Sequence, residues 1–254
     1  MNFVSDNVTG AAPEILAAIE AGNTGALMPY GNDDVTRAAE AKVAALFETE
    51  VGVFFIATGT AANSLALSAT TPPWGAVFCH GGAHVFDTEL AAPEFYSGGA
   101  KLITLPGDNG KFKPETLETA IADAQVGNVH HVQPASVSIT QATETGSIYS
   151  LDEIAAIAKV CKAHGLKLHM DGARFSNAVA ALGCSAAEIS WKAGVDILSF
   201  GATKNGALTA EAVVIFDPDM ARDFGYRRKR GGHVRRYRPR PPRVQVHQDP
   251  EGPG

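Results

Sequence analysis

Seven short apolar runs, rich in Val, Ile and Phe, alternate along the chain with stretches of helical periodicity. Runs that are apolar at nearly every position are typical of strands buried on both faces, and parallel strands require helical crossovers between them. We therefore predict an α/β fold in which a mostly parallel seven-stranded sheet is covered by helices, two of them over 114–124 and 151–164. The predicted strands span 53–57, 76–79, 101–105, 128–134, 167–170, 196–200 and 212–216.

The composition is that of a globular protein. Of the 254 residues, 45% are hydrophobic and 19% charged, which argues against disordered and fibrous classes. No apolar run reaches the ~18 residues of a membrane span, and the first residues lack the basic and apolar regions of a signal peptide, so we expect a cytoplasmic protein with no membrane partner. Cys79, Cys161 and Cys184 lack disulfide or metal-site spacing, and we expect buried free thiols and no metal.

The end of the chain differs in charge from the rest. Nine of the 21 basic residues lie between Arg227 and Arg243, without apolar periodicity. We therefore predict one domain over 1–226 and a disordered basic, proline-rich tail over 227–254. Clustered arginines can neutralise phosphates, but the tail contains one aromatic residue, Tyr237, and no recognition motif, so we expect no nucleic-acid partner.

Polar residues follow several of the predicted strands, where open parallel sheets bind their ligands. Asp171 comes directly after an apolar strand, so its carboxylate should be partly buried and in need of a partner. Lys204 lies among small and apolar residues, where its amine should be desolvated and able to form a Schiff base. Viewed alone, Asp171 could equally be a turn residue and Lys204 a surface lysine.

A third feature favours a specific ligand for this pair. Gly59 and Thr60 open a helical stretch after the first predicted strand, where free backbone N–H groups and the helix dipole favour a phosphate. Pyridoxal phosphate needs one group for its aldehyde, one for its pyridine nitrogen and a cradle for its phosphate. The three features together predict pyridoxal 5'-phosphate as a cofactor.

The motifs that carry these residues resemble the threonine aldolase and β-eliminating lyase family of pyridoxal-phosphate enzymes. The resemblance runs from Phe3 to about His233 and implies the large domain of the aspartate aminotransferase-type fold (fold type I). Its carriers are Ser5-Asp6-Asn7, Tyr30 to Asp33, Ala57 to Asn63, His84 to Phe95, His169 to Arg174 and Ser199 to Ala207.

The resemblance implies roles around the cofactor. Lys204 would bind it covalently, Asp171 would pair with its pyridine nitrogen, and Gly59 and Thr60 would hold its phosphate. His84 would stack on its ring and is our candidate base, although a bound water could serve equally. Without the resemblance, His84 would be interpreted as a structural core histidine.

The resemblance also implies how an amino acid substrate would bind. Arg174, with Ser5, would face the substrate carboxylate, because a guanidinium matches a carboxylate with two parallel hydrogen bonds. Without the resemblance, Arg174 would be interpreted as half of a surface ion pair. Tyr30 would reach across a subunit interface, so we expect a homodimer or homotetramer.

The implied activity is retro-aldol cleavage of a β-hydroxy amino acid, threonine or allo-threonine, to glycine and an aldehyde. Two alternatives stay open. The chain could be another lyase of the same fold, such as a phenylserine aldolase or a β-eliminating lyase, or a truncated relative that binds the cofactor without activity.

The sequence departs from the family at two places. Gln141 stands where some relatives have a histidine, so a secondary substrate contact could be altered. After residues 227–233 the family continues into a helical small domain that supplies another carboxylate-binding arginine, whereas this chain continues with a basic, proline-rich segment. Our hypothesis is that the sequence is a frameshifted or truncated reading of a longer gene.

Overall fold

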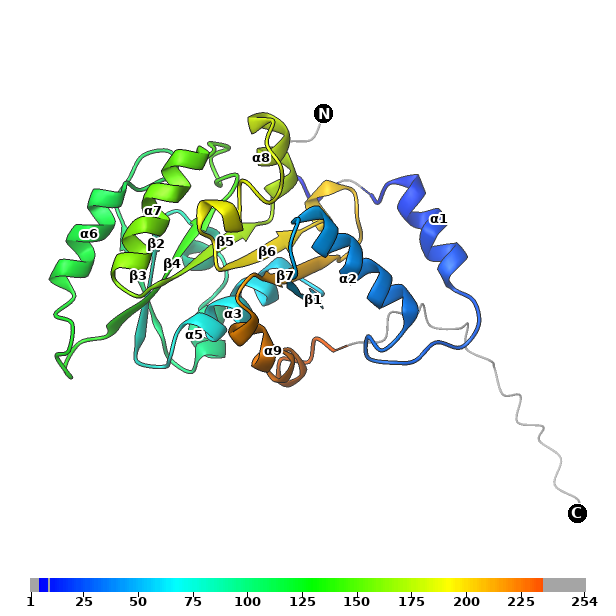
Figure 1. Ribbon diagram of the computed structural model, residues 1–254, viewed down its shortest axis with the longest axis horizontal. Helices are drawn as coiled ribbons and strands as arrows, with labels where there is room; N and C mark the ends of the chain where they lie inside the picture. The colour runs from blue at the N-terminus through cyan, green and yellow to red at the C-terminus, as the bar shows by residue number, and fades with distance from the viewer. Residues whose placement is uncertain (1–4, 9, 235–254) are drawn as a thin grey trace, which may run out of the picture.

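A sheet of seven strands runs through the part of the chain that the computed structural model describes, residues 5–8 and 10–234 (Figure 1). The spatial order is β1-β7-β6-β5-β4-β2-β3. β7 is antiparallel to both of its neighbours, and the other pairs are parallel. The predicted mostly parallel seven-stranded sheet is therefore confirmed. The strands are β1 Gly52–Ile56, β2 Gly75–His80, β3 Lys101–Leu105, β4 Gln133–Thr140, β5 Lys167–Gly172, β6 Ile197–Gly201 and β7 Glu211–Ile215.

The prediction of a strand over 128–134 was wrong, because β4 begins only at Gln133. The residues before it form hydrogen-bonded turns, in which the Gln133 side chain accepts from the Gly127 N–H and donates to the Asn128 carbonyl. The later part of β4 contains the polar residues Ser136 and Ser138. In the fold their hydroxyls are buried and paired, with Ser136 2.7 Å from the Thr71 hydroxyl, so they do not interrupt the strand.

Helices cover both faces of the sheet. Apolar residues of α6, α7 and α8 pack with Val137, Leu168 and other strand residues in one core cluster. α3 and α9 pack against β1, β6 and β7 in a second cluster on the opposite face. The helices are α1 Pro13–Gly22, α2 Asp34–Leu46, α3 Gly59–Thr70, α4 His84–Asp87, α5 Ala92–Ser97, α6 Pro114–Asp123, α7 Leu151–Ala163, α8 Phe175–Leu182 and α9 Pro218–Arg230, with short 3-10 turns η1 Trp191–Ala193 and η2 Thr203–Asn205.

The two helices predicted from the sequence are confirmed as α6 and α7, and their ends follow local chemistry. Pro114 occupies the first turn of α6, where a missing N–H has no cost. Ser150 and Glu153 form a capping box at the start of α7, in which each side chain accepts from the other's backbone N–H. Gly165, with φ 69°, ends that helix in the left-handed region.

The prediction of irregular chain from residue 227 onward was wrong for its first residues. α9 is capped by Asp217, is anchored by the buried Phe224 and continues to Arg230. Its last turn carries four basic side chains, which the negative end of the helix dipole favours. The rest of the predicted tail, from Arg235 to Gly254, lies outside the described residues.

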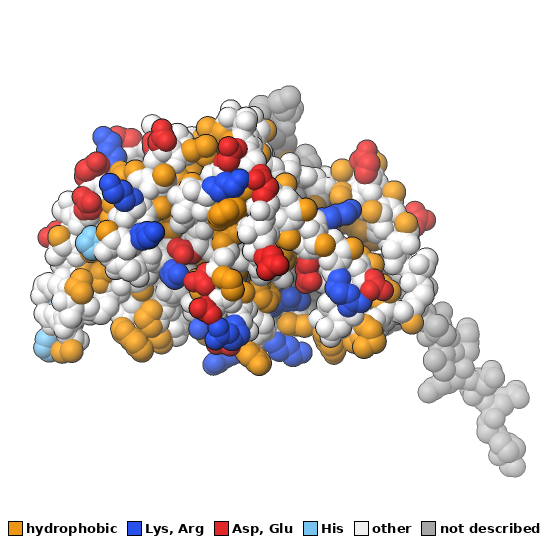
Figure 2. All heavy atoms as spheres, viewed as in Figure 1, with side chains coloured by type: hydrophobic (Ala, Val, Ile, Leu, Met, Phe, Trp, Pro, Cys, Tyr) orange, Lys and Arg blue, Asp and Glu red, His pale blue; other side chains and the backbone are white. Residues whose placement is uncertain are grey.

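α1 lies apart from the sheet, at the right of Figure 1. It has no buried residue, and Leu16 is 51% exposed. Figure 2 shows apolar side chains at the surface in this part of the molecule. Among the described residues, no helix combines the length and the apolar character that crossing a membrane demands.

Candidate active site

The candidate site residues come together at one edge of the sheet. β1, β2, β5 and β6 all run in the same direction, so the loops that follow them meet at their shared carboxyl edge. These loops carry Gly59, His84 and Lys204, and Asp171 lies near the end of β5. Because β7 runs the other way, its first residue, Glu211, lies at this edge too.

Asp171 is buried on the face of the sheet that α3 covers. Alternation along β5 sends Leu168 and Met170 into the core cluster of the opposite face, so Asp171 points toward α3. Its side chain accepts from the Ala173 N–H at 3.0 Å and from Asn63 Nδ2 at 2.9 Å. Asp171 is 3% exposed, and no basic side chain of the described residues forms an ion pair with it. The site therefore contains a buried carboxylate without an ion-pair partner among the described residues.

His84 begins α4 and is held through its backbone and its ring. Its backbone N–H donates to Glu144 Oε1 at 2.7 Å, and its ring Nδ1 lies 2.8 Å from Glu89 Oε1. The Glu89 side chain is fully buried, while that of His84 is 40% exposed. The hydrogen bond to Glu89 raises the pKa of His84, against an opposing effect of burial, and burial raises the pKa of Glu89. Both shifts favour the protonated forms of the two side chains.

Lys204 lies in the η2 turn after β6, and its side chain is half-buried rather than fully desolvated. The turn is fixed by Thr203, whose backbone N–H and hydroxyl bond to the buried carboxylate of Glu211. Burial raises the pKa of Glu211, and these bonds and the Lys204 charge oppose the rise. The same ammonium charge acts on His84 and on Asp6, so Lys204 lies within electrostatic range of all three groups.

Gly59 and Thr60 form the first turn of α3, as predicted. Thr58 caps the helix by accepting from the Ala61 N–H at 3.2 Å, and the N–H groups of Gly59 and Thr60 precede the first bond within the helix. A Cβ placed on Gly59 would meet no atom within 4 Å. The space in front of this helix end is therefore open to an anion.

Arg174 follows β5 and is engaged by Asp6. Its Nε lies 2.7 Å from Asp6 Oδ2, and its second contact, from Nη2 to Oδ1, is 3.3 Å. Burial raises the pKa of Asp6, but the Arg174 hydrogen bond and charge outweigh it and hold that pKa below its usual value. The Ser5 hydroxyl accepts from the Asn7 N–H at 3.2 Å. In the described structure, the guanidinium of Arg174 is thus paired with Asp6 of the N-terminal segment.

Two residues of the sequence prediction lie in other surroundings. Tyr30 is 55% exposed, and Lys229 Nζ lies 4.9 Å from the centre of its ring. Its predicted role across a subunit interface stays a prediction. Gln141 is fully buried, and its amide makes two hydrogen bonds to the backbone of Tyr149, at 2.8 and 3.0 Å. Both ends of its side chain are thus used within the fold, so Gln141 is not in place as a substrate contact.

Sequence reasoning assigned no role to Asp6, Asn63, Glu89 or Glu211, which surround the predicted residues. Asn63 lies one helical turn beyond Gly59, on the face of α3 that meets the sheet. Glu89 is an acidic residue five positions after His84 that the fold buries completely. Glu211 is a charged residue at the start of an otherwise apolar strand. An acidic residue at the start of an apolar strand is the sequence signal that could have indicated Glu211.

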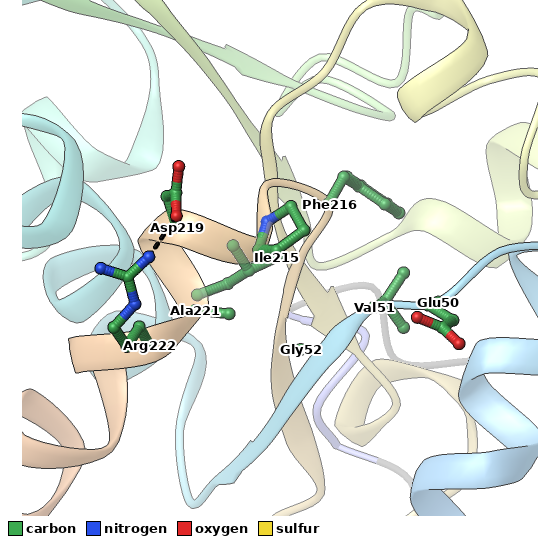
Figure 3. A pocket seen from close by; sticks show the side chains of 9 residues that line it. Glu50, Val51, Gly52, Ile215, Phe216, Asp219, Ala221 and Arg222 are labelled. Atoms are coloured by element: carbon green, nitrogen blue, oxygen red, sulfur yellow. Dashed lines mark hydrogen bonds and ion pairs between the residues drawn. The ribbon is translucent and has the colours of Figure 1, made fainter.

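A hollow lies at the opposite edge of the sheet, where β1 begins and β7 ends (Figure 3). It is lined by the charged residues Glu50, Asp219 and Arg222, and the last two pair with one another, as the dashed line shows. The hollow is thus separate from the candidate site. Among the described residues, no group of three or more His, Cys, Asp or Glu side chains could hold a metal ion. Cys79 and Cys161 are buried free thiols, as predicted, and Cys184 is half-buried.

Comparison with known proteins identifies the family of the chain. The sequence model of the β-eliminating lyase family matches residues 2–238. The chain belongs to the β-eliminating lyase family. A low specificity L-threonine aldolase of a Pseudomonas species is 48% identical to it over 232 residues, which are 91% of this chain and 66% of that protein. This member of the family thus spans slightly less than two thirds of the relative's length.

The fold agrees with solved structures. A threonine aldolase of Leishmania major superposes with a TM-score of 0.86 at 31% identity, covering 92% of this chain and 68% of the other. An alanine–glyoxylate aminotransferase of a Nostoc species superposes with a TM-score of 0.61 at 18% identity, covering 87% of this chain and 54% of the other. The second match shows the fold alone, and it agrees with the predicted aminotransferase-type large domain.

Proposed function

We propose that this member of the β-eliminating lyase family binds pyridoxal 5'-phosphate at the carboxyl edge of its sheet and cleaves a β-hydroxy amino acid to glycine and an aldehyde. The observation that carries the proposal is Asp171, a carboxylate that is 3% exposed and has no ion-pair partner among the described residues. An unpaired buried charge is unfavourable, and a protonated pyridine nitrogen would supply the missing counter-charge.

The surrounding residues fit the rest of the cofactor. Gly59 and Thr60 offer helix N-terminal N–H groups to the phosphate, with open space in front of them. Lys204 would hold the cofactor covalently through Nζ, and the half-exposed ring of His84 would cover it. Buried oxygens of Asn63 and Glu89 lack hydrogen-bond partners, so this region can accept a further donor. The bound cofactor supplies an electron sink for the bond cleaved at Cα.

The chain's own residues would bind and orient the substrate. Arg174 would bind the substrate carboxylate, which requires that it exchange Asp6 for this ligand. The His84 ring would take the proton of the β-hydroxyl group, and a bound water is the alternative base. As the Cα–Cβ bond breaks, the hydroxyl oxygen becomes the aldehyde carbonyl oxygen, and Cα keeps the bonding electrons until it gains a proton to give glycine.

Threonine and allo-threonine are the proposed substrates. Two relatives that are 48% identical to this chain carry the name low specificity L-threonine aldolase. The alternatives are phenylserine cleavage, β-elimination, and a chain that binds the cofactor without turnover. We further propose a cytoplasmic enzyme that works as a homodimer or homotetramer, since α1 exposes apolar side chains along its length.

Product analysis separates these functions. The purified chain, supplied with pyridoxal phosphate, would be incubated with threonine, allo-threonine, phenylserine and serine. Glycine and acetaldehyde from threonine or allo-threonine would support the proposal. Glycine and benzaldehyde from phenylserine alone, ammonia and pyruvate from serine alone, or cofactor binding without any product would each contradict it in favour of one alternative.

A further inference from the structure

The side chains of His84, Glu89, Asn63 and Asp171 form one hydrogen-bonded chain from the loop after β2 to the end of β5. Glu89 Oε1 lies 2.8 Å from His84 Nδ1 and 2.8 Å from Asn63 Nδ2. The same Asn63 nitrogen lies 2.9 Å from Asp171 Oδ2. Glu89 therefore connects two residues of the proposed cofactor site, although it has no part in the proposed chemistry.

The direction of each hydrogen bond follows from the groups involved. The Asn63 nitrogen can only donate, and a carboxylate can only accept, so Asn63 donates to both Glu89 and Asp171. Turning the amide over would place its oxygen against two carboxylates. An ionised Glu89 accepts from His84 as well, which puts a ring proton on Nδ1. In the neutral form of the imidazole, the lone pair is then on Nε2.

Burial makes this arrangement hard to rearrange. The Glu89 side chain is completely buried, and its Oε2 has no hydrogen-bond partner within the described part of the chain. The carboxylate cannot turn to water, so its bonds to His84 and Asn63 are what compensate its desolvation. The His84 ring is anchored at its buried nitrogen, while 40% of its side chain remains exposed on the other side.

We propose that Glu89 is a positioning residue that fixes the orientation and the tautomer of His84, so that Nε2 is presented as a proton acceptor. Asn63 couples this pair to Asp171. The consequence for catalysis rests on the proposed function, whereas the tautomer is a property of the cofactor-free protein. The charged groups that act on His84 are Glu89 and Asp171, which favour its protonation, and Lys204, which opposes it.

Histidine NMR on the cofactor-free protein tests the proposal directly. Long-range ¹H–¹⁵N spectra of the wild type should show His84 with the proton on Nδ1 in its neutral form. Glu89→Gln keeps the shape but removes the charge, and the titration midpoint of His84 should move to lower pH. Asp87→Asn is the matched control, because Asp87 is an exposed acid three residues from His84, and the midpoint should stay at the wild-type value.

The wild-type spectrum does not depend on any variant being folded, and thermal unfolding of Glu89→Gln reports whether that variant is. An Nε2-protonated His84 in the wild type would overturn the proposal. An unchanged His84 midpoint in folded Glu89→Gln would overturn it as well.

A kinetic experiment separates this inference from the proposed function. With the cofactor bound, Glu89→Gln should lower kcat for threonine cleavage with little change in KM, and the acidic limb of the pH profile should move to lower pH. If the wild type turns over no β-hydroxy amino acid while the NMR result holds, the proposed function fails and the positioning of His84 stands. If the wild type is active and the acidic limb stays unmoved in Glu89→Gln, the positioning role fails.

Discussion

Strand alternation gives β5 two polar residues on one face, His169 and Asp171, and both are buried beneath α3. Asp171 forms no ion pair among the described residues, whereas burial keeps His169 neutral. The His169 ring lies 2.9 Å from the Ser138 hydroxyl and 3.0 Å from the Ser199 hydroxyl, which links three adjacent strands. The same strand face thus carries Asp171, which is available to pair with a ligand, and His169, whose hydrogen bonds are made within the fold.

Replacing Asp171 should separate ligand binding from stability. Asp171→Asn removes the uncompensated charge, which favours the cofactor-free fold, but it also turns an amide NH2 group toward a donor, which opposes it. The unfolding free energy of the cofactor-free protein should therefore change less than in Asp196→Asn. The Kd for pyridoxal phosphate should rise on the order of 30-fold or more, as expected when a buried charge pair loses about 2 kcal/mol or more. Urea unfolding and cofactor titration measure the two effects.

Asp196→Asn is the control for this prediction. Asp196 accepts from the Leu168 N–H at 2.7 Å and pairs with Lys167, at the far end of the sheet. This variant should lose stability and keep its cofactor affinity. Equal losses of stability in both variants would contradict a ligand-binding role for Asp171.

His169 predicts a specific dependence of stability on pH. Burial lowers the pKa of His169 to about 4, from 6.5 in the unfolded chain. Below pH 6.5 the unfolded chain therefore binds a proton that the folded protein excludes, and stability falls as the pH drops toward 4. The contribution is about 3 kcal/mol across this window at ~1.4 kcal/mol per pH unit. Urea unfolding of wild type and His169→Gln should differ in slope there, and equal slopes would rule the effect out.

At the scale of elements, the strands whose two faces are both buried were predictable, because their apolar runs are nearly continuous. β4 was misplaced since its serines are paired only through contacts with Thr71 and His169, which local sequence does not reveal. α9 was not predicted, because Phe224 anchors it against the sheet and the helix dipole favours the basic side chains of its last turn.

Some residues of the candidate site could likewise be predicted from the sequence, and others could not. Lys204 and Gly59 follow strands and Asp171 lies near the end of one, so their common location was predictable from topology. Glu89 and Asn63 bond across 26 residues of sequence, and only the folded chain brings them together. The ion pair between Asp6 and Arg174, which are 168 residues apart, could not be predicted from the sequence for the same reason.

The cap of α3 should matter for stability and for phosphate binding together. Thr58→Ala removes the side chain that accepts from the Ala61 N–H, which should lower the unfolding free energy by about 1 kcal/mol and weaken binding of pyridoxal phosphate. Ser150→Ala removes the equivalent cap of α7 and should lower stability by a similar amount while leaving cofactor affinity unchanged. Equal affinities in both variants would show that the start of α3 does not hold the phosphate.

At the scale of the whole molecule, the exposed apolar residues of α1 predict self-association. Leu16 and Ile19 are 51% and 38% exposed, on a helix with no buried residue. Sedimentation of the wild type should give at least twice the chain mass of 26.5 kDa, and Leu16→Glu with Ile19→Glu should lower it. Val129→Glu, at a 93% exposed position away from α1, is the control. A wild type that sediments as a single chain would contradict the prediction.

The central claim is that the carboxyl edge of the sheet holds pyridoxal phosphate through Lys204 and Asp171. Visible absorbance after cofactor addition and gel filtration tests it most directly. The wild type should retain a band from the covalently held cofactor, and so should Lys192→Ala, which removes an exposed lysine paired with Glu48. Lys204→Ala should lose the band. A wild type that retains no cofactor, or a Lys204→Ala variant that keeps the band, would contradict the claim.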